Sequence, residues 1–235
     1  MKWRSIANFA LLPLILMPTV HATSQNQPIK SPIQFESTRV YLNGDQREGF
    51  LTVRNNGDVP YYIVAKLLDV STKSRSKDFL VSPPSAMLSA KDQLTLRIVR
   101  VSDSLSKEIE SASFLQLRLL PGEREQTDNR IKAIYNFFVK VFYRSKELQK
   151  SDAIEDAVKK MGLACQDREV SLKNNSPYWL TIVHRADNKQ NNKSWFLPPW
   201  GLKKQSFDIC PDSLNLQFIN ESGVASKSSN IKLGT

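Results

Sequence analysis

Short segments in which apolar and polar residues alternate recur along this chain, and they predict an all-β protein. The longest segment, at 131–144, has the two-residue period that gives a strand one apolar face. Clusters of Asn, Gly, Asp and Pro separate the segments, for example at 55–58 and 121–122. Regular spacing of this kind is typical of an immunoglobulin-like β-sandwich.

About seven strands are expected in the first half of the chain, each ending at a turn or a proline. Pro83 and Pro84 have to leave the sheet or lie at its edge, because proline has no N–H to donate. The expected strands are 33–42, 49–53, 61–70, 79–81, 94–101, 114–120 and 131–144.

Residues 145–160 mix charged and apolar side chains, and they are the best candidate for a helix and for a domain boundary. A second sandwich is expected after them, because the turn at 174–177 resembles the one at 55–60 and each precedes an apolar segment containing Tyr. The predicted domains are therefore 23–145 and 146–235. The expected strands of the second are 169–172, 178–184, 194–197, 205–209, 214–219 and 231–233.

The N-terminus has the organisation of a secretory signal peptide at 1–22. Lys2 and Arg4 precede an apolar stretch at 6–17 that is too short to span a bilayer, and residues 20–22 form a suitable cleavage site. Cleavage near Ala22 predicts an exported mature chain. The alternative, an uncleaved membrane anchor, is disfavoured by the short length of the stretch and by its prolines.

The chain has 235 residues and a net charge of +10, enough length for two domains with apolar cores. A basic chain can bind nucleic acid, an anionic membrane or an acidic protein, or it can simply be more soluble. Nucleic-acid binding is disfavoured because no run of Lys and Arg exceeds two residues.

Two cysteines, Cys165 and Cys210, are predicted to form a disulfide if the chain is exported. The alternative is a pair of buried free thiols. A metal site is disfavoured because neither cysteine has a Cys or His close to it in the sequence.

An enzyme is not expected. His184 is the one histidine left after signal cleavage, and it falls within a predicted strand. The sequence contains no nucleophile motif such as G-x-S-x-G, no phosphate-binding glycine loop and no zinc motif. These observations favour a binding protein.

The residues resemble the periplasmic chaperones of the chaperone–usher pathway, which assemble pili in Gram-negative bacteria. The similarity covers the mature chain, and the order and spacing of several short motifs carry it. The motifs are Ser-Thr-Arg-Val-Tyr at 37–41, Leu-Thr-Val-Arg-Asn-Asn at 51–56, Phe-Leu-Val-Ser-Pro-Pro at 79–84, Leu-Arg-Ile-Val-Arg at 96–100, Val-Lys-Val-Phe-Tyr-Arg at 139–144, Leu-Lys-Asn-Asn-Ser-Pro-Tyr at 172–178 and Ile-Asn-Glu-Ser-Gly at 219–223.

The resemblance implies two immunoglobulin-like domains at an angle, with a cleft between them, and no cofactor. It also implies that Arg39 and Lys140 correspond to two cleft cations that bind the C-terminal carboxylate of a pilin subunit. Arg offers a planar fork of donors and Lys a compact charge, so a carboxylate held by both accepts charge-assisted hydrogen bonds. The alternative for each residue is an ordinary surface cation.

The resemblance further implies a donor strand, whose alternating apolar side chains fill the groove of an incomplete pilin. The matching positions are Ile131, Ala133 and Tyr135, with Phe137 as a possible extension. The alternative is that this row faces the chaperone's own core, because alternation does not tell which face is exposed. Lys140 has the opposite parity, so a twist or a bulge has to reconcile the two roles.

Three more positions match charges that the family uses between its domains: Glu110, Arg144 and Glu221, the last being Asp in most members. The resemblance implies that they fix the angle between the domains. An exposed pair of this kind would contribute less than about 1 kcal/mol.

The implied function is a periplasmic chaperone that binds pilin subunits by donor-strand complementation and delivers them to an outer-membrane usher. Some members also self-associate when free, and the short connection at 123–130 resembles the short-loop subgroup. Two alternatives remain: a structural pilus subunit or adhesin, and an exported hydrolase. Arg39 and Lys140 argue against the first, and the scarcity of histidine argues against the second.

Overall fold

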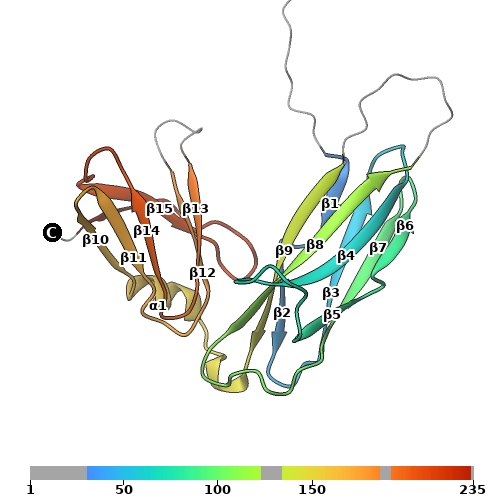
Figure 1. Ribbon diagram of the computed structural model, residues 1–235, viewed down its shortest axis with the longest axis horizontal. Helices are drawn as coiled ribbons and strands as arrows, with labels where there is room; N and C mark the ends of the chain where they lie inside the picture. The colour runs from blue at the N-terminus through green and yellow to red at the C-terminus, as the bar shows by residue number, and fades with distance from the viewer. Residues whose placement is uncertain (1–30, 123–133, 186–191, 234–235) are drawn as a thin grey trace, which may run out of the picture. The chain divides into compact units, whose positions relative to one another are not determined.

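The computed structural model describes residues 31–122, 134–185 and 192–233, which form two β-sandwiches with one short α-helix (Figure 1). The predicted signal peptide at 1–22 lies outside the described residues, as do Ile131 and Ala133. The expected all-β fold is confirmed. No helix among the described residues is long and apolar enough to cross a membrane.

The first sandwich consists of two sheets, with strand orders β1-β3-β7-β5 and β2-β9-β8-β4-β6. Its strands are β1 (Ile33–Phe35), β2 (Arg39–Asn43), β3 (Glu48–Asn55), β4 (Tyr61–Asp69), β5 (Phe79–Ser82), β6 (Ser85–Leu88), β7 (Gln93–Arg100), β8 (Ser111–Pro121) and β9 (Tyr135–Arg144). Alternation places one face of each strand in the core, as at Leu115, Leu117 and Leu119 of β8, which are fully buried.

The single strand expected at 33–42 is wrong, because the chain changes sheets within it. β1 pairs with β3 in one sheet, whereas β2 pairs with β9 in the other. The β2–β9 pair is parallel, with Arg39 opposite Lys140 and Asn43 opposite Arg144. The apolar residues change parity across this crossing, from Ile33 and Phe35 to Val40 and Leu42, and the polar residues 36–39 between them were the sequence sign of the change.

The second sandwich has sheets of order β10-β11-β14 and β13-β12-β15-β16. Its strands are β10 (Gly162–Gln166), β11 (Glu169–Lys173), β12 (Leu180–His184), β13 (Lys193–Leu197), β14 (Leu202–Ser206), β15 (Ser213–Phe218) and β16 (Ser229–Lys232). A second cluster of buried apolar residues, from Leu148 to Leu216, forms its core. The predicted domain boundary after Ser145 falls between the two clusters and stays a prediction.

The helix expected at 145–160 is shorter than predicted. A 3-10 turn, η1 (Lys146–Leu148), precedes the seven-residue α1 (Ala153–Lys159). Asp152 separates them, with a left-handed backbone (φ 56°) that no α-helix can contain. The sequence also missed β6 and β10, two short strands at sheet edges.

The two similar turns noticed in the sequence have the same internal bonding. Asn55 is buried and donates from Nδ2 to two carbonyl oxygens, of Val59 at 2.8 Å and of Ser89 at 2.9 Å. Asn174 is also buried and donates to the carbonyl oxygens of Tyr178 at 2.7 Å and of Pro198 at 2.8 Å. Each asparagine therefore ties a turn to a second loop of its own sandwich.

The predicted disulfide is present between Cys165 of β10 and Cys210, with the two Cα atoms 5.8 Å apart. It joins an edge strand of the second sandwich to the segment after β14. No group of three or more residues suited to hold a metal ion occurs in the described part of the chain.

Candidate anion-binding site

Two cations predicted from the sequence lie side by side on the parallel strands β2 and β9. Arg39 begins β2 and is the register partner of Lys140 in the middle of β9. Arg39 is 5% exposed, while Lys140 is partly exposed. Parallel pairing brings them together although they are far apart in the sequence.

No carboxylate of the described residues forms an ion pair with either cation. Burial, together with the nearby charge of Arg39, lowers the pKa of Lys140 to about 8. Two neighbouring positive charges, one of them buried, are costly without a counter-charge. The geometry therefore suits an anion supplied from outside the described chain.

Aromatic rings surround the two cations. The Arg39 guanidinium lies 5.8 Å from the centre of the Phe142 ring, and the Lys140 Nζ lies 5.1 Å from that of Phe196. Phe196 in turn packs on Trp179, with ring centres 4.5 Å apart. These rings attract the cations weakly and limit their access to water, which strengthens any interaction with an anion.

The first half of β9 has an open backbone edge in the described structure. β8 pairs with β9 along Tyr135–Tyr143, but β2 pairs with it from Lys140 onward. The backbone of 135–139 is therefore free on the β2 side among the described residues. Such an edge can receive a strand from another chain.

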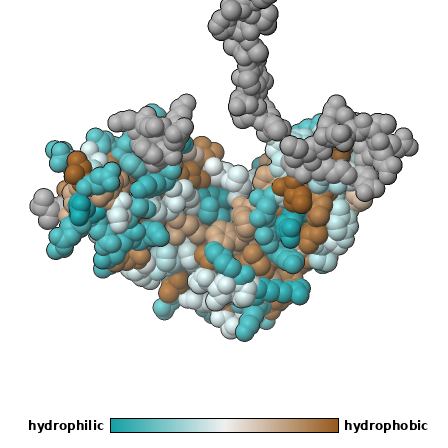
Figure 2. Space-filling model, turned by 45° about the horizontal axis from the view of Figure 1, so that its top comes forward, coloured by the Kyte–Doolittle hydropathy of each residue, from teal (hydrophilic) through white to brown (hydrophobic). Residues whose placement is uncertain are grey.

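The side chains of β9 show which parity faces the core. Tyr135 and Phe137 are partly buried, and their rings lie 5.9 Å from Tyr61 and 4.8 Å from Phe35, respectively. The opposite parity is exposed, with Phe138 52% exposed. On the face drawn in Figure 2, apolar patches interrupt the hydrophilic surface of the described residues. The donor role of Tyr135 and Phe137 stays a prediction.

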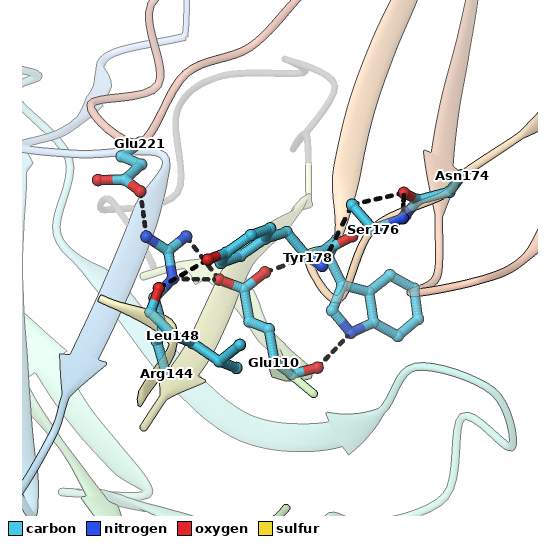
Figure 3. A network of polar contacts seen from close by, with 8 residues as sticks. Glu110, Arg144, Leu148, Asn174, Ser176, Tyr178 and Glu221 are labelled. Carbon is cyan, nitrogen blue, oxygen red and sulfur yellow. Dashed lines mark hydrogen bonds and ion pairs between the residues drawn. The ribbon is translucent and has the colours of Figure 1, made fainter. Parts of the chain in front are cut away.

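The three other predicted charges meet in one polar network (Figure 3). Arg144 donates to Glu110 Oε1 from Nε at 2.9 Å and from Nη2 at 2.7 Å, and its Nη1 donates to Glu221. Arg144 and Glu110 have side-chain exposures of 3% and 0%, whereas Glu221 is 48% exposed. The first pair is thus a buried ion pair, to which the small value expected for an exposed pair does not apply.

Residues that the sequence did not single out complete this network. The Trp179 backbone N–H donates to Glu110 Oε2 at 2.8 Å, and its indole Nε1 donates to the Glu110 carbonyl oxygen at 3.0 Å. Burial raises the pKa of Glu110, while Arg144 and the Trp179 N–H oppose that rise. The repeated turn before Tyr178 was the one sequence sign that this segment has a structural role.

Comparison with known proteins identifies the family. The profile described as "Pili and flagellar-assembly chaperone, PapD N-terminal domain" matches residues 32–149, half of the chain. The chain belongs to this chaperone family. The matched segment contains both Arg39 and Lys140 and the whole first sandwich.

Named relatives agree with this assignment. The probable fimbrial chaperone protein ElfD of Escherichia coli K12 is 25% identical over 209 residues, which cover 86% of this chain and 88% of the relative. The chaperone protein LpfB of Salmonella typhimurium is 24% identical over 172 residues, covering 72% of this chain and 74% of the relative. This pilus-assembly chaperone family is thus matched along most of the chain.

Solved chaperone structures share the fold. The periplasmic chaperone SfaE superposes with a TM-score of 0.68 and 23% identity, covering 84% of this chain and 98% of that one. The SafB chaperone, solved in complex with the SafA pilin from Salmonella enterica, gives a TM-score of 0.72 at 19% identity, covering 86% of this chain and 96% of the matched chain.

Proposed function

We propose that this chaperone acts in the periplasm, where it binds a pilin subunit by adding β9 to it and holds the subunit's C-terminal carboxylate between Arg39 and Lys140. It then delivers the subunit to an outer-membrane usher. Family membership supports the chaperone role, and the complex of SafB with a pilin supports this kind of partner. The proposal contains no catalytic step and no cofactor.

One observation carries the proposal: the open edge of β9 ends at the pair of cations. A strand that pairs with 135–139 on the β2 side reaches Lys140 and Arg39 at its end. If that end is its C-terminus, the strand runs parallel to β9, as β2 does further along. Backbone hydrogen bonds then supply affinity along the strand, and the carboxylate fixes its register.

The carboxylate also supplies the counter-charge that the described structure lacks. Without it, the buried Arg39 guanidinium and the partly buried Lys140 ammonium repel each other. A bound carboxylate satisfies both and accepts charge-assisted hydrogen bonds. We propose in addition that Ile131, Ala133, Tyr135 and Phe137 offer apolar side chains to the pilin, and that Glu110, Arg144 and Glu221 fix how the two domains 23–145 and 146–235 are joined.

The test is capture of a pilin from the periplasm by tagged chaperone, in cells that express the neighbouring pilin genes, with mass spectrometry of the bound proteins. Wild type should retain a small pilin-like protein, and Lys140→Ala should lose it. Lys140→Ala should still fold, because it removes a charge whose burial is unfavourable. Lys66→Ala is the matched control, since Lys66 is an exposed lysine of β4 in the same sheet.

Equal recovery of the pilin by wild type and Lys140→Ala would contradict the carboxylate anchor. Recovery of no pilin by either protein would contradict the chaperone role itself. Secretion into the periplasm is checked in the same experiment, because the tagged mature chain should begin near Thr23.

A further inference from the structure

Tyr41 lies next to Arg39 and Lys140, the proposed carboxylate anchor, but the proposed function gives it no role. It lies two residues after Arg39 on β2, so both side chains are on the same face of the sheet. Its ring stacks on Phe142 of β9, with centres 4.6 Å apart and planes 13° from parallel. The Arg144 guanidinium lies 5.3 Å from the Tyr41 ring centre, which fixes the ring between the two strands and that cation.

The Tyr41 hydroxyl is buried and has no hydrogen-bond partner in the described part of the chain. The Arg39 guanidinium is nevertheless close enough to lower the pKa of the hydroxyl. Arginine can only donate hydrogen bonds, so it leaves the phenolic proton without an acceptor. A buried donor without an acceptor costs about 1–3 kcal/mol, which a fold tolerates where a ligand supplies the missing partner.

The proton stays on the hydroxyl at any physiological pH. Burial raises the pKa of Tyr41 to about 12, and the nearby charge of Glu110 acts in the same direction. Tyr41 is therefore a permanent neutral donor. Its neighbour Arg39 is a charged donor, which can donate to the phenol oxygen but cannot accept the phenol proton.

We infer that the Tyr41 hydroxyl is a third hydrogen-bond donor for the carboxylate that binds at Arg39 and Lys140. This inference rests on the proposed function and extends it to a residue that the sequence did not indicate. A carboxylate has two oxygens with about four acceptor positions, enough for a guanidinium, an ammonium and a phenol together. Three donors of fixed direction favour a planar carboxylate over a spherical anion.

The test uses Tyr41→Phe, with Tyr62→Phe as the matched control because Tyr62 is an exposed tyrosine of the same sheet. The probe is acetate, the smallest carboxylate, titrated into isotope-labelled full-length mature protein, with acetamide as the uncharged comparison. NMR follows the signals of Arg39 and Lys140 and the ring carbon that bears the Tyr41 oxygen. In wild type, acetate should shift these signals saturably and move the ring carbon toward its tyrosinate value.

Tyr41→Phe should weaken acetate binding about tenfold, the effect of losing one hydrogen bond to a charged group. The same variant should be as stable as wild type or more stable, because it removes a buried hydroxyl for which residues 31–122, 134–185 and 192–233 supply no hydrogen-bond partner. Tyr62→Phe should change neither property. Tyr41→Phe should therefore weaken acetate binding without lowering the stability of the fold. A tyrosine that only supported the fold would lower the stability when it was replaced.

Unchanged acetate affinity in Tyr41→Phe, or an unmoved ring-carbon signal in wild type, would overturn the inference while leaving the anchor intact. Lys140→Ala in the same titration tests the anchor separately. If Lys140→Ala binds acetate as wild type does, or if wild type shows no saturable binding, the proposed site itself fails.

Discussion

The buried ion pair between Arg144 and Glu110 allows a sharp prediction for the variant Arg144→Met. Methionine has a similar length and still fills the space beside the aromatic rings, but it carries no charge and donates no hydrogen bond. The Glu110 carboxylate would lose two hydrogen bonds and its counter-charge. Of the hydrogen bonds observed to this carboxylate, the one from the Trp179 backbone N–H would remain. The change thus leaves a carboxylate with no exposed surface and no cation beside it.

Breaking a buried pair in this way costs about 3–5 kcal/mol of unfolding free energy. The Arg144 guanidinium also lies 4.9 Å from the Tyr178 ring centre, a contact that adds about 0.5–2 kcal/mol to the loss. By contrast, Glu221→Gln affects a half-exposed partner and should cost less than about 1 kcal/mol. The double variant Arg144→Met with Glu110→Met should recover much of the stability, because no buried charge remains.

Equilibrium urea unfolding, followed by circular dichroism and by tryptophan fluorescence, measures these differences. With a slope of about 2 kcal/mol per molar urea, a total loss of about 3.5–7 kcal/mol should lower the Arg144→Met midpoint by about 2–3.5 M. Glu221→Gln is the comparison within the same network. An Arg144→Met midpoint within about 0.3 M of the Glu221→Gln midpoint would refute the reasoning that Arg144→Met leaves the buried Glu110 carboxylate without a counter-charge.

Three further results are expected. The double variant Cys165→Ser with Cys210→Ser should lose about 4 kcal/mol of unfolding free energy, because the disulfide closes a loop with a sequence separation of 45 residues. Calorimetry measures this loss, and an unchanged unfolding transition would show that the disulfide does not constrain the unfolded chain. Asn55→Ala and Asn174→Ala should each cost about 2 kcal/mol by urea unfolding, because each removes a buried amide that donates two hydrogen bonds of about 1 kcal/mol each. A loss below about 1 kcal/mol in both variants would contradict that role. Carboxylate binding should be constant below pH 8 and should weaken above it, by up to tenfold per pH unit. The reason is that Lys140 of the free protein loses its proton near pH 8, whereas a bound carboxylate favours the charged form of Lys140. Equal affinity at pH 7 and pH 9.5 would exclude Lys140 as the anchor.

Much of the local structure followed from the sequence. The two-residue period of segments such as β8 and β9 identified strands, because alternate side chains of a strand point to opposite faces. The similar turns at Asn55 and Asn174 were visible as repeated residue types, and the structure gives both the same bonding. The cysteine pairing was also predictable, since the sequence contains two cysteines.

The errors had a common cause in non-local pairing. The crossing between β1 and β2 shifts the apolar parity between Phe35 and Val40, but a shift of this kind does not by itself tell a bulge within one strand from a change of sheet. The edge strands β6 and β10 are short, and the pairing of each with a neighbouring strand defines it more than its own composition does. The helix at 145–160 was overestimated because its interruption at Asp152 depends on a backbone angle that aspartate does not require.

In the candidate site, too, some features followed from the sequence and others only from the tertiary structure. The sequence by itself determined the kinds of residue present: strands with one apolar face, two cations within recognisable motifs and three further charges. The tertiary structure alone decided that Arg39 lies opposite Lys140 and that Glu110 and Arg144 are buried together. It alone also showed that, among the described residues, the β9 edge beside this pair is open and the Tyr41 hydroxyl lacks a hydrogen-bond partner. The physical reason is that alternation defines the two faces of a strand, whereas burial, counter-charge and hydrogen-bond partners come from strands distant in the chain.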